Sequence, residues 1–221
     1  MLPEFKDPTL LTTALSLRSS LNESDSGTTA SESYERLEFL GDAVLELAAT
    51  EFLFAECPGE PEGSLTAYRS ALVKTTTLAA IARKLELGQR MFISKGEEST
   101  GGRENEGLLA DVFEAVIGAL YLDQGFEVVK KFLHEHLFTQ FAEIKSKKLY
   151  RDSKSVLQEM VQAQGSPTPA YEVVQEEGPD HDKVFTIEVK VDGKVLGSGS
   201  GKSKQLAQQE AARQALEVLE A

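Results

Sequence analysis

The sequence predicts a large all-α domain followed by a small α+β domain with the element order α-β-β-β-α. Apolar residues recur at helical spacing in segment after segment as far as residue 149. From Asp152 onward, short stretches of alternating apolar and polar residues replace that spacing. Residues 141–154, where the pattern changes, are enriched in Lys, Ser, Arg and Asp. We therefore divide the chain into domains 1–148 and 149–221.

The first predicted helix lies within residues 5–21. Asp7-Pro8-Thr9 supplies its start signal, because proline is tolerated in a first helical turn. The next stretch, residues 22–33, is acidic and rich in Ser and Thr, which predicts a mobile loop. A long helix follows over residues 34–54, and two prolines and two glycines then break the helical pattern.

Helical periodicity resumes over residues 64–87, with Ser64 as the predicted N-cap and Gly88 as the end. Residues 94–103 are rich in glycine and are predicted to be a loop. After a further apolar helix over residues 108–123, an amphipathic helix is expected from Phe126 to Leu149. Its last turns complement the helix dipole with Lys145, Lys147 and Lys148.

The second domain begins with a short helix and continues with three strands and a final helix. Asp192-Gly193 is a strong hairpin signal between the second and third strands. The predicted elements are a helix over 153–164, strands over 171–174, 184–191 and 195–198, and a helix over 203–219. The final helix is expected to face inward with Leu206, Ala207, Ala211, Ala215, Leu216 and Leu219.

Composition narrows the class of protein. Hydrophobic residues make up 41% of the 221 residues, which is enough for a substantial core. The chain has no apolar run of transmembrane length and no signal-peptide pattern at its start, so we expect a cytoplasmic protein without a membrane partner. Cys57 is the only cysteine, which excludes an intramolecular disulfide and favours a packed small side chain.

The net charge of −13 argues against a general nucleic-acid binder. Residues 1–150 carry 15 Lys and Arg against 24 Asp and Glu, giving −9, and residues 151–221 carry 8 against 12, giving −4. Neither part is basic. Net charge governs solubility and steering, however, and does not exclude one local binding patch.

Two acidic patterns are embedded in apolar helices. In residues 34–54, the steps between Glu35, Glu38 and Asp42 place three carboxylates on one helical face. In residues 108–123, Asp111 and Glu114 are spaced i, i+3 on a helix that is apolar almost all round and is therefore expected to be buried. One such pattern alone would favour a solvated acidic stripe. Two buried helices that meet with carboxylates predict a Mg²⁺ site, because Mg²⁺ prefers oxygen ligands.

The runs ERLEFLGDAVLE and LADVFEAVIGALYLD resemble the two acidic helices of the ribonuclease III endonucleases, and the resemblance covers nearly the whole chain. It implies a site for Mg²⁺, or Mn²⁺ in its place, made by Glu38, Asp42, Asp111 and Glu114. The implied reaction is endonucleolytic hydrolysis of double-stranded RNA to 5′-phosphate and 3′-hydroxyl ends. The implied role is maturation or decay of rRNA and mRNA.

Two further acidic residues are accessory candidates. Glu62 aligns with an acidic position near the family's cleavage site, although a solvated loop glutamate is an equal alternative. Glu35 is the second accessory candidate. The chain departs from the family at Ser16-Leu17-Arg18-Ser19, where relatives usually carry Thr-His-Arg-Ser. That departure touches no metal ligand.

In the second domain, SVLQEMVQ, GPDHDKVF and GSGKSKQLAQQEAA resemble the double-stranded-RNA-binding domain. Such domains contact two minor grooves and the phosphates between them. The resemblance implies RNA contacts by Gln158, Glu159, Gln162, His181, Lys202, Ser203 and Lys204. The basic cluster is incomplete, because Gln205 and Gln208 stand where relatives typically have basic residues.

The resemblance also implies a homodimer in which Phe39 packs against the partner. From the sequence alone, Phe39 is equally well explained as a core residue. Two other functions stay open: an RNA-binding relative that does not cut, and a helical metalloprotein acting on a small molecule. All four carboxylates are present, which argues against the first. The absence of Glu-x-x-His motifs argues against the second.

Overall fold

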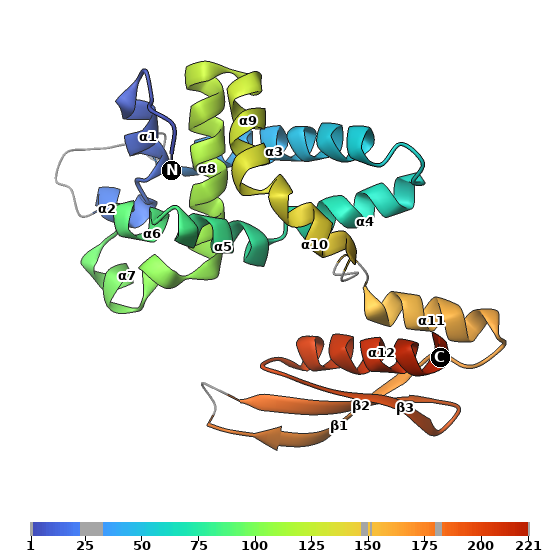
Figure 1. The fold of residues 1–221 in the computed structure, drawn as a ribbon. Coiled ribbons are helices and arrows are strands. Elements are labelled where there is room, and N and C mark those ends of the chain that lie inside the picture. The colour runs from blue at the N-terminus through green and yellow to red at the C-terminus, as the bar shows by residue number, and fades with distance from the viewer. Residues whose placement is uncertain (1, 23–32, 147–149, 151, 180–182, 221) are drawn as a thin grey trace. The chain divides into compact units, whose positions relative to one another are not determined.

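The computed structural model describes residues 2–22, 33–146, 150, 152–179 and 183–220. The chain divides into two compact units, Met1–Tyr150 and Arg151–Ala221 (Figure 1). The first is helical, and the second combines helices with a three-stranded sheet, as the sequence predicts. The loop predicted over 22–33 lies almost wholly outside the described residues, and so does the predicted domain boundary between 148 and 149.

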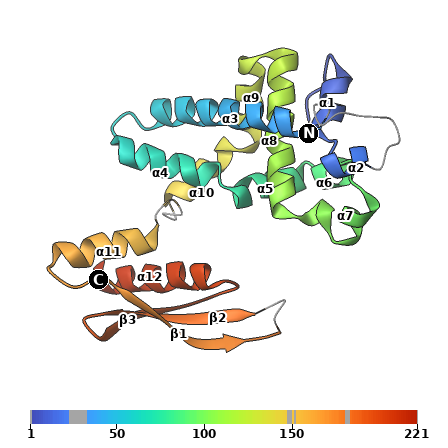
Figure 2. The same cartoon turned by 180° about the vertical axis from the view of Figure 1, so that it is seen from behind.

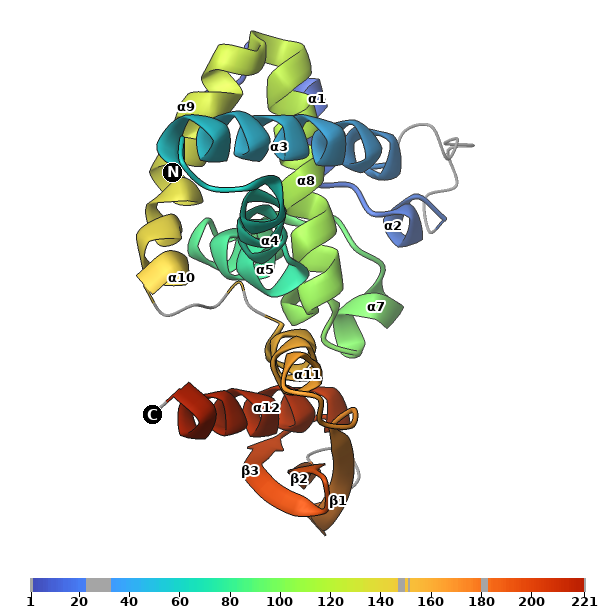
Figure 3. The ribbon, with the colours of Figure 1, turned by 90° about the vertical axis from the view of Figure 1, so that its right-hand side faces the viewer.

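The first unit is built around two long helices, α3 (Glu35–Glu56) and α8 (Glu106–Gln124), which cross each other (Figures 1 and 3). The other helices pack around this crossing. They are α1 (Pro8–Ala14), α2 (Arg18–Asn22), α4 (Glu62–Leu72), α5 (Thr75–Lys84), α6 (Leu87–Arg90), α7 (Lys95–Ser99), α9 (Phe126–His136) and α10 (Phe141–Ser146), with 3-10 turns η2 (Gly102–Glu104) and η3 (Phe138–Gln140).

Glycines on both helices allow the backbones of α3 and α8 to come very close. A Cβ atom on Gly41 would lie 1.8 Å from the carbonyl oxygen of Glu114, and one on Gly118 would lie 2.2 Å from that of Leu37. Both distances are far below van der Waals contact, so any side chain there would push the helices apart. This close crossing brings the acidic residues of the two helices together.

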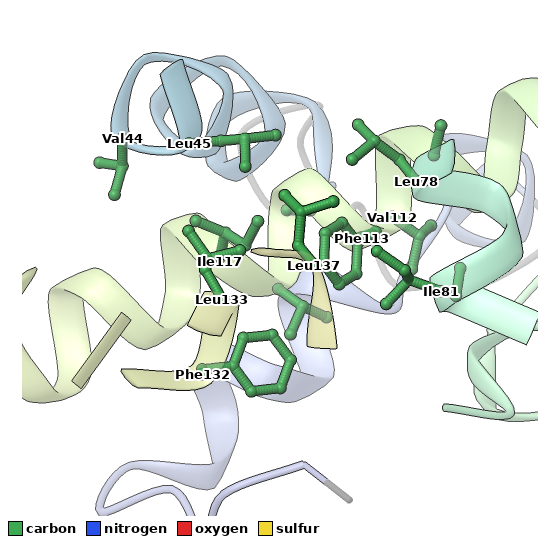
Figure 4. Close-up of a cluster of buried hydrophobic side chains, with 14 of the residues drawn as sticks. Val44, Leu45, Leu78, Ile81, Val112, Phe113, Ile117, Phe132, Leu133 and Leu137 are labelled. Atoms are coloured by element: carbon green, nitrogen blue, oxygen red, sulfur yellow. The ribbon is translucent and has the colours of Figure 1, made fainter. Parts of the chain in front are cut away.

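The core of the first unit surrounds α8, which is apolar on nearly all sides, as expected (Figure 4). Phe113 and Ile117 of α8 are fully buried. Side chains from α3, α5 and α9 surround α8, among them Leu45, Ile81 and Leu133. Burial of large apolar side chains contributes about 1.5–3 kcal/mol each, so this cluster holds the crossing in place.

Three segments predicted as single elements are divided. The predicted helix over 5–21 is α1 and α2, because the chain between them pairs with Phe92, whose N–H donates to Leu15 over 2.8 Å. The predicted helix over 64–87 begins at Glu62 and not at a Ser64 cap. It also ends at Leu72, and α5 begins at Thr75. The hydroxyl of Thr77 donates to the carbonyl of Ala71 over 3.2 Å, which holds the chain together across this break.

The segment after α8 also differs from the prediction. Residues 126–146 form α9, a 3-10 turn and α10 in place of one helix, and the break at Leu137 buries that side chain in the core. The basic end lies outside the described residues except for Lys145. The glycine-rich loop contains α7, which is N-capped by Ser94: its Oγ accepts from the N–H of Glu97 over 3.1 Å.

The second unit contains α11 (Ser153–Ala163), β1 (Ala170–Glu177), β2 (Val184–Val191), β3 (Lys194–Gly201) and α12 (Lys204–Glu220). The strands are antiparallel in the order β1-β2-β3, and both helices cover one face of the sheet (Figures 1 and 2). The predicted turn is confirmed, with φ of 51° at Asp192 and 73° at Gly193.

The core of this unit joins α11 and α12 to β2, with Leu157, Val189 and Ala211 among its buried residues. Leu206 was predicted to face inward but is 59% exposed. It lies one residue before Ala207, where the inward stripe of α12 begins. In the part of the chain that the structure describes, no helix combines the length and apolar character needed to cross a bilayer.

Candidate functional site

Glu38, Asp111 and Glu114 meet at the crossing of α3 and α8. One carboxylate oxygen from each residue lies within 4.8 Å of the other two, and all three side chains are half-buried. The backbone carbonyl of Glu114 faces Gly41 of α3. Gly41 follows Glu38 by one helical turn, so this contact brings Glu114 close to Glu38. We call these three residues the acidic cluster.

Burial and mutual repulsion make ionisation of the acidic cluster costly. Burial raises the pKa of Glu114 to about 8, and the charges of Asp42, Asp111 and Glu38 add to the rise. Burial also raises the pKa of Asp111, and burial and the charge of Asp111 raise that of Glu38. No lysine or arginine within the described residues forms an ion pair with the cluster. Hard oxygen donors in this arrangement fit a divalent cation.

The other predicted acidic residues lie at different distances from this cluster. Asp42 is exposed one turn beyond Glu38 on α3, outside the close group, but its charge contributes to the raised pKa of Glu114. Glu35 is exposed one turn before Glu38, with Arg18 at 4.0 Å. Glu62 begins α4, where it accepts a hydrogen bond from Thr66 over 3.0 Å, and it is not joined to the cluster.

The structure adds residues that the sequence analysis did not single out. Tyr34 precedes α3 with a buried side chain; burial and then the charges of Asp111 and Glu38 raise the pKa of its phenol to about 12. Glu46 follows Asp42 by one turn and is held by Arg69 at 2.8 Å. Tyr34, Glu38, Asp42 and Glu46 are spaced by four residues, so extending the pattern along the helix would have found both.

Ser19, in the segment Ser16–Ser19 that departs from the family pattern, is hydrogen-bonded to Glu97 and Ser94. The hydroxyl of Ser19 donates to the carboxylate of Glu97, and its oxygen accepts from the N–H of Ser94 over 3.3 Å. Glu97 is also among the charges that act on Tyr34. This contact ties α7 to the chain beside the acidic cluster, and the Leu17 departure leaves it intact, since the Leu17 side chain is buried in the core.

In the second unit, Gln158, Glu159 and Gln162 are exposed on α11. Lys202, Ser203 and Lys204 are exposed where α12 begins, and Ser203 accepts a hydrogen bond from the N–H of Leu206 over 3.2 Å. His181 lies outside the described residues.

Of the two glutamines in place of basic residues, Gln205 is exposed. Gln208 accepts a hydrogen bond from Nζ of Lys154 over 2.6 Å. Lys154 of α11 therefore already places a positive charge beside Gln208.

Phe39 is 82% exposed, so the core alternative for this residue is wrong. Leu47 and Phe54 are also exposed on α3, at eight and fifteen residues from Phe39. These spacings keep the three side chains on about the same face of the helix. We call this face the apolar face of α3. Leu122 of α8 and Phe39 line a common groove of about 640 Å³.

Two family models match the chain over separate ranges. The model of the family described as "Ribonuclease-III-like" matches residues 7–141, more than half of the chain. The chain belongs to the ribonuclease III family. The family model for the double-stranded RNA binding motif matches residues 153–219, which confirms the predicted nature of the second domain.

Individual relatives from the ribonuclease III family match large parts of the chain. Ribonuclease 3 of Roseiflexus sp. is 45% identical over 98% of this chain and 91% of its own. Ribonuclease 3 of Geobacillus thermodenitrificans is 50% identical over 86% and 77%. The solved nuclease domain of ribonuclease III from Campylobacter jejuni is 41% identical, covers 63% of this chain and 92% of its own, and superposes with a TM-score of 0.57. Its description concerns flexibility in a region involved in dimer formation.

Proposed function

We propose that this protein is a metal-dependent endoribonuclease that hydrolyses double-stranded RNA to 5′-phosphate and 3′-hydroxyl ends. The observation that supports this most strongly is the acidic cluster: three half-buried carboxylates brought together by a glycine-mediated helix crossing, with raised pKa values. Family membership and the RNA-binding domain supply the class of substrate. The biological role that we propose is processing of rRNA and mRNA in the cytoplasm.

Glu38, Asp111 and Glu114 would hold the cation, which we propose to be Mg²⁺ with Mn²⁺ as a substitute. Asp42 is the fourth proposed ligand, since its charge already acts on Glu114. When bound, a divalent ion supplies charge stabilisation and activates water for attack on a phosphodiester. Without it, the raised pKa of Glu114 means that this carboxyl keeps a proton near neutral pH.

Residues around the acidic cluster would help to fix the positions of its carboxylates. Tyr34 stands beside Glu38 and Asp111, and Arg69 neutralises Glu46 at the other end of the acidic face. Glu35 and Glu62 are exposed and lie outside the cluster, so we assign them accessory roles toward the RNA at most.

The second unit would hold the duplex. Gln158, Glu159 and Gln162 present polar groups on one side of α11, suited to minor-groove edges and 2′-hydroxyls. Lys202 precedes α12 and Lys204 is its first residue, at the end of the helix where the dipole also favours phosphate. His181 remains a proposed contact.

We further propose a homodimer through the apolar face of α3. Phe39, Leu47 and Phe54 are large and exposed, as is typical of an interface and unusual for a free surface. The groove beside Phe39 would bind an apolar side chain from the same face of the partner subunit. The description of the Campylobacter relative mentions dimer formation by its nuclease domain, which supports a dimer without saying which face forms it. Two acidic clusters would then act on one duplex, one for each strand.

The alternative of an RNA-binding relative that does not cut requires a broken metal site, and no carboxylate of the proposed set is missing. Incubation of the purified protein with a long RNA duplex distinguishes the endoribonuclease from an RNA-binding relative that does not cut. With Mg²⁺, 5′-phosphorylated fragments are expected; with chelator, or with single-stranded RNA of the same composition, none. An intact duplex in Mg²⁺, bound but uncut, would support the alternative.

A further inference from the structure

Lys204, one of the proposed phosphate contacts, lies against the sheet next to an acidic residue. Glu176 of β1 pairs with Phe185 of β2, and Phe185 pairs with Gly201 of β3, so the three form one row across the sheet. Lys204 follows three residues after Gly201. Its ammonium group lies 5.3 Å from the centre of the Phe185 ring and 3.3 Å from Oε1 of Glu176.

The second oxygen of the same carboxylate faces another lysine. Nζ of Lys183, which precedes β2, lies 3.7 Å from Oε2 of Glu176. Glu176 therefore contacts two lysines, one that directly precedes β2 and one that begins α12. Each carboxylate oxygen of Glu176 contacts one lysine, and two oxygens of one phosphate group would contact the same two lysines in the same way.

We propose that Glu176 is an internal competitor for RNA phosphate, which holds Lys204 and Lys183 in the free protein and sets the affinity and salt dependence of duplex binding. The proposal rests on the proposed function, because it takes Lys204 as a phosphate contact. On binding, the lysines exchange a carboxylate for phosphates. The released carboxylate then regains its own counterion, which offsets part of the counterion release that drives binding.

The competition is weak enough for RNA to overcome. The Lys204 side chain is 57% exposed and that of Glu176 39% exposed, and exposed ion pairs of this kind contribute at most about 1 kcal/mol. Loss of the competitor should therefore tighten binding by about two- to fivefold at low salt. It should also steepen the log–log salt dependence by about 0.7 to 0.9, the amount expected for one phosphate.

Glu176→Gln tests this in the full chain, with chelator present so that the duplex stays intact. Glu172→Gln is the matched control, because Glu172 lies on the same strand, carries the same charge and is paired with a different lysine, Lys190, at 2.6 Å. Binding is titrated at several salt concentrations, and thermal melting checks that each variant is folded. Glu176→Gln should show the tighter binding and the steeper slope, and Glu172→Gln should keep the slope of the unaltered chain.

A double-mutant cycle assigns the effect to the two lysines. In a Lys183→Gln/Lys204→Gln background, Glu176→Gln should tighten binding no more than Glu172→Gln does. Equal effects of the two glutamate changes in the unaltered background would overturn the competition while leaving RNA binding established. If the unaltered chain binds no duplex at any salt concentration, the proposed function and this inference both fail.

Discussion

At the scale of single residues, the proposed chemistry depends on half-buried carboxylates whose pKa values are raised by burial and by neighbouring charge. Glu114 is the extreme case, with a pKa raised to about 8 by burial and neighbouring charge. A proton and a divalent ion would compete for this carboxyl. The same site should therefore respond to both pH and metal.

The first prediction concerns the stability of the metal-free protein. The folded-state pKa of Glu114 lies above its ordinary value of 4.5, so the folded chain binds more protons than the unfolded chain between about pH 4.5 and pH 8. Its contribution to the free energy of unfolding must fall as pH rises through this range. In chelator, the melting temperature of the unaltered protein should fall, relative to that of Glu114→Gln, as pH rises. Parallel curves for the two proteins would contradict the raised pKa.

The second prediction concerns the two glutamines of α12. Gln205 is exposed beside Lys204, so Gln205→Lys should tighten duplex binding by about three- to tenfold at low salt and steepen the salt slope by about one. Gln208 already accepts a hydrogen bond from Lys154 over 2.6 Å. Gln208→Lys would place two ammonium groups together and should gain little. Binding titrations at several salt concentrations measure both, and equal gains would show that Lys154 does not supply the charge at position 208.

At the scale of elements, the crossing of α3 and α8 determines the site. Gly41 and Gly118 each face a backbone carbonyl of the other helix at a distance that leaves no room for a methyl group. The carboxylates on the two helices converge for this reason. Their positions therefore depend on the helix spacing as much as on their own spacing along the chain.

The third prediction follows from that crossing. Gly118→Ala should separate the helices, lower the free energy of unfolding by about 1–3 kcal/mol and weaken Mg²⁺-dependent cleavage. Gly63→Ala is the control, because Gly63 lies in α4 with open space around it; it should stabilise the protein by up to about 1 kcal/mol. Denaturant unfolding and a cleavage assay measure both. If Gly118→Ala behaves like Gly63→Ala, the close crossing is not what positions the cluster.

The sequence predicted most elements and the residues of the acidic cluster, and its errors have identifiable causes. Periodicity places residues on faces but does not detect a break that tertiary contacts impose, such as the pairing of Leu15 with Phe92 or the burial of Leu137. The two roles open for Phe39 could not be separated either, because an apolar residue in an apolar helix fits a core or an interface equally well. Partners distant in sequence, such as Lys204 and Glu176, are visible only in the fold.

At the scale of the whole molecule, the chain has two units with separate cores, and we assign cleavage to the first and RNA binding to the second. The acidic cluster lies wholly within the first unit, and the proposed duplex contacts lie in the second. Both are negatively charged overall, at −9 and −4. Repulsion between protein and RNA is therefore largest at low salt, and the few local cations must offset it.

The fourth prediction concerns the division between the units. Deletion of residues 151–221 should leave a folded helical protein, since its core is independent of the second unit. It should still cut duplex RNA at low salt and high protein concentration, and should lose most activity at physiological salt, where fewer phosphate contacts no longer suffice. Unchanged activity at physiological salt would show that the second unit does something other than hold RNA.

The central claim is that Glu38, Asp111 and Glu114 form a metal site that cleaves double-stranded RNA. Cleavage of a long duplex in Mg²⁺ by Glu114→Gln tests it most directly. Glu106→Gln is the control, because it removes the same charge from an exposed position on the same helix, where Glu106 forms an ion pair with Arg83 at 3.6 Å. Glu114→Gln should lower the rate by at least about a hundredfold while leaving duplex binding in Ca²⁺ measurable, and Glu106→Gln should cut at close to the unaltered rate. Cleavage by Glu114→Gln at the rate of Glu106→Gln would contradict the claim.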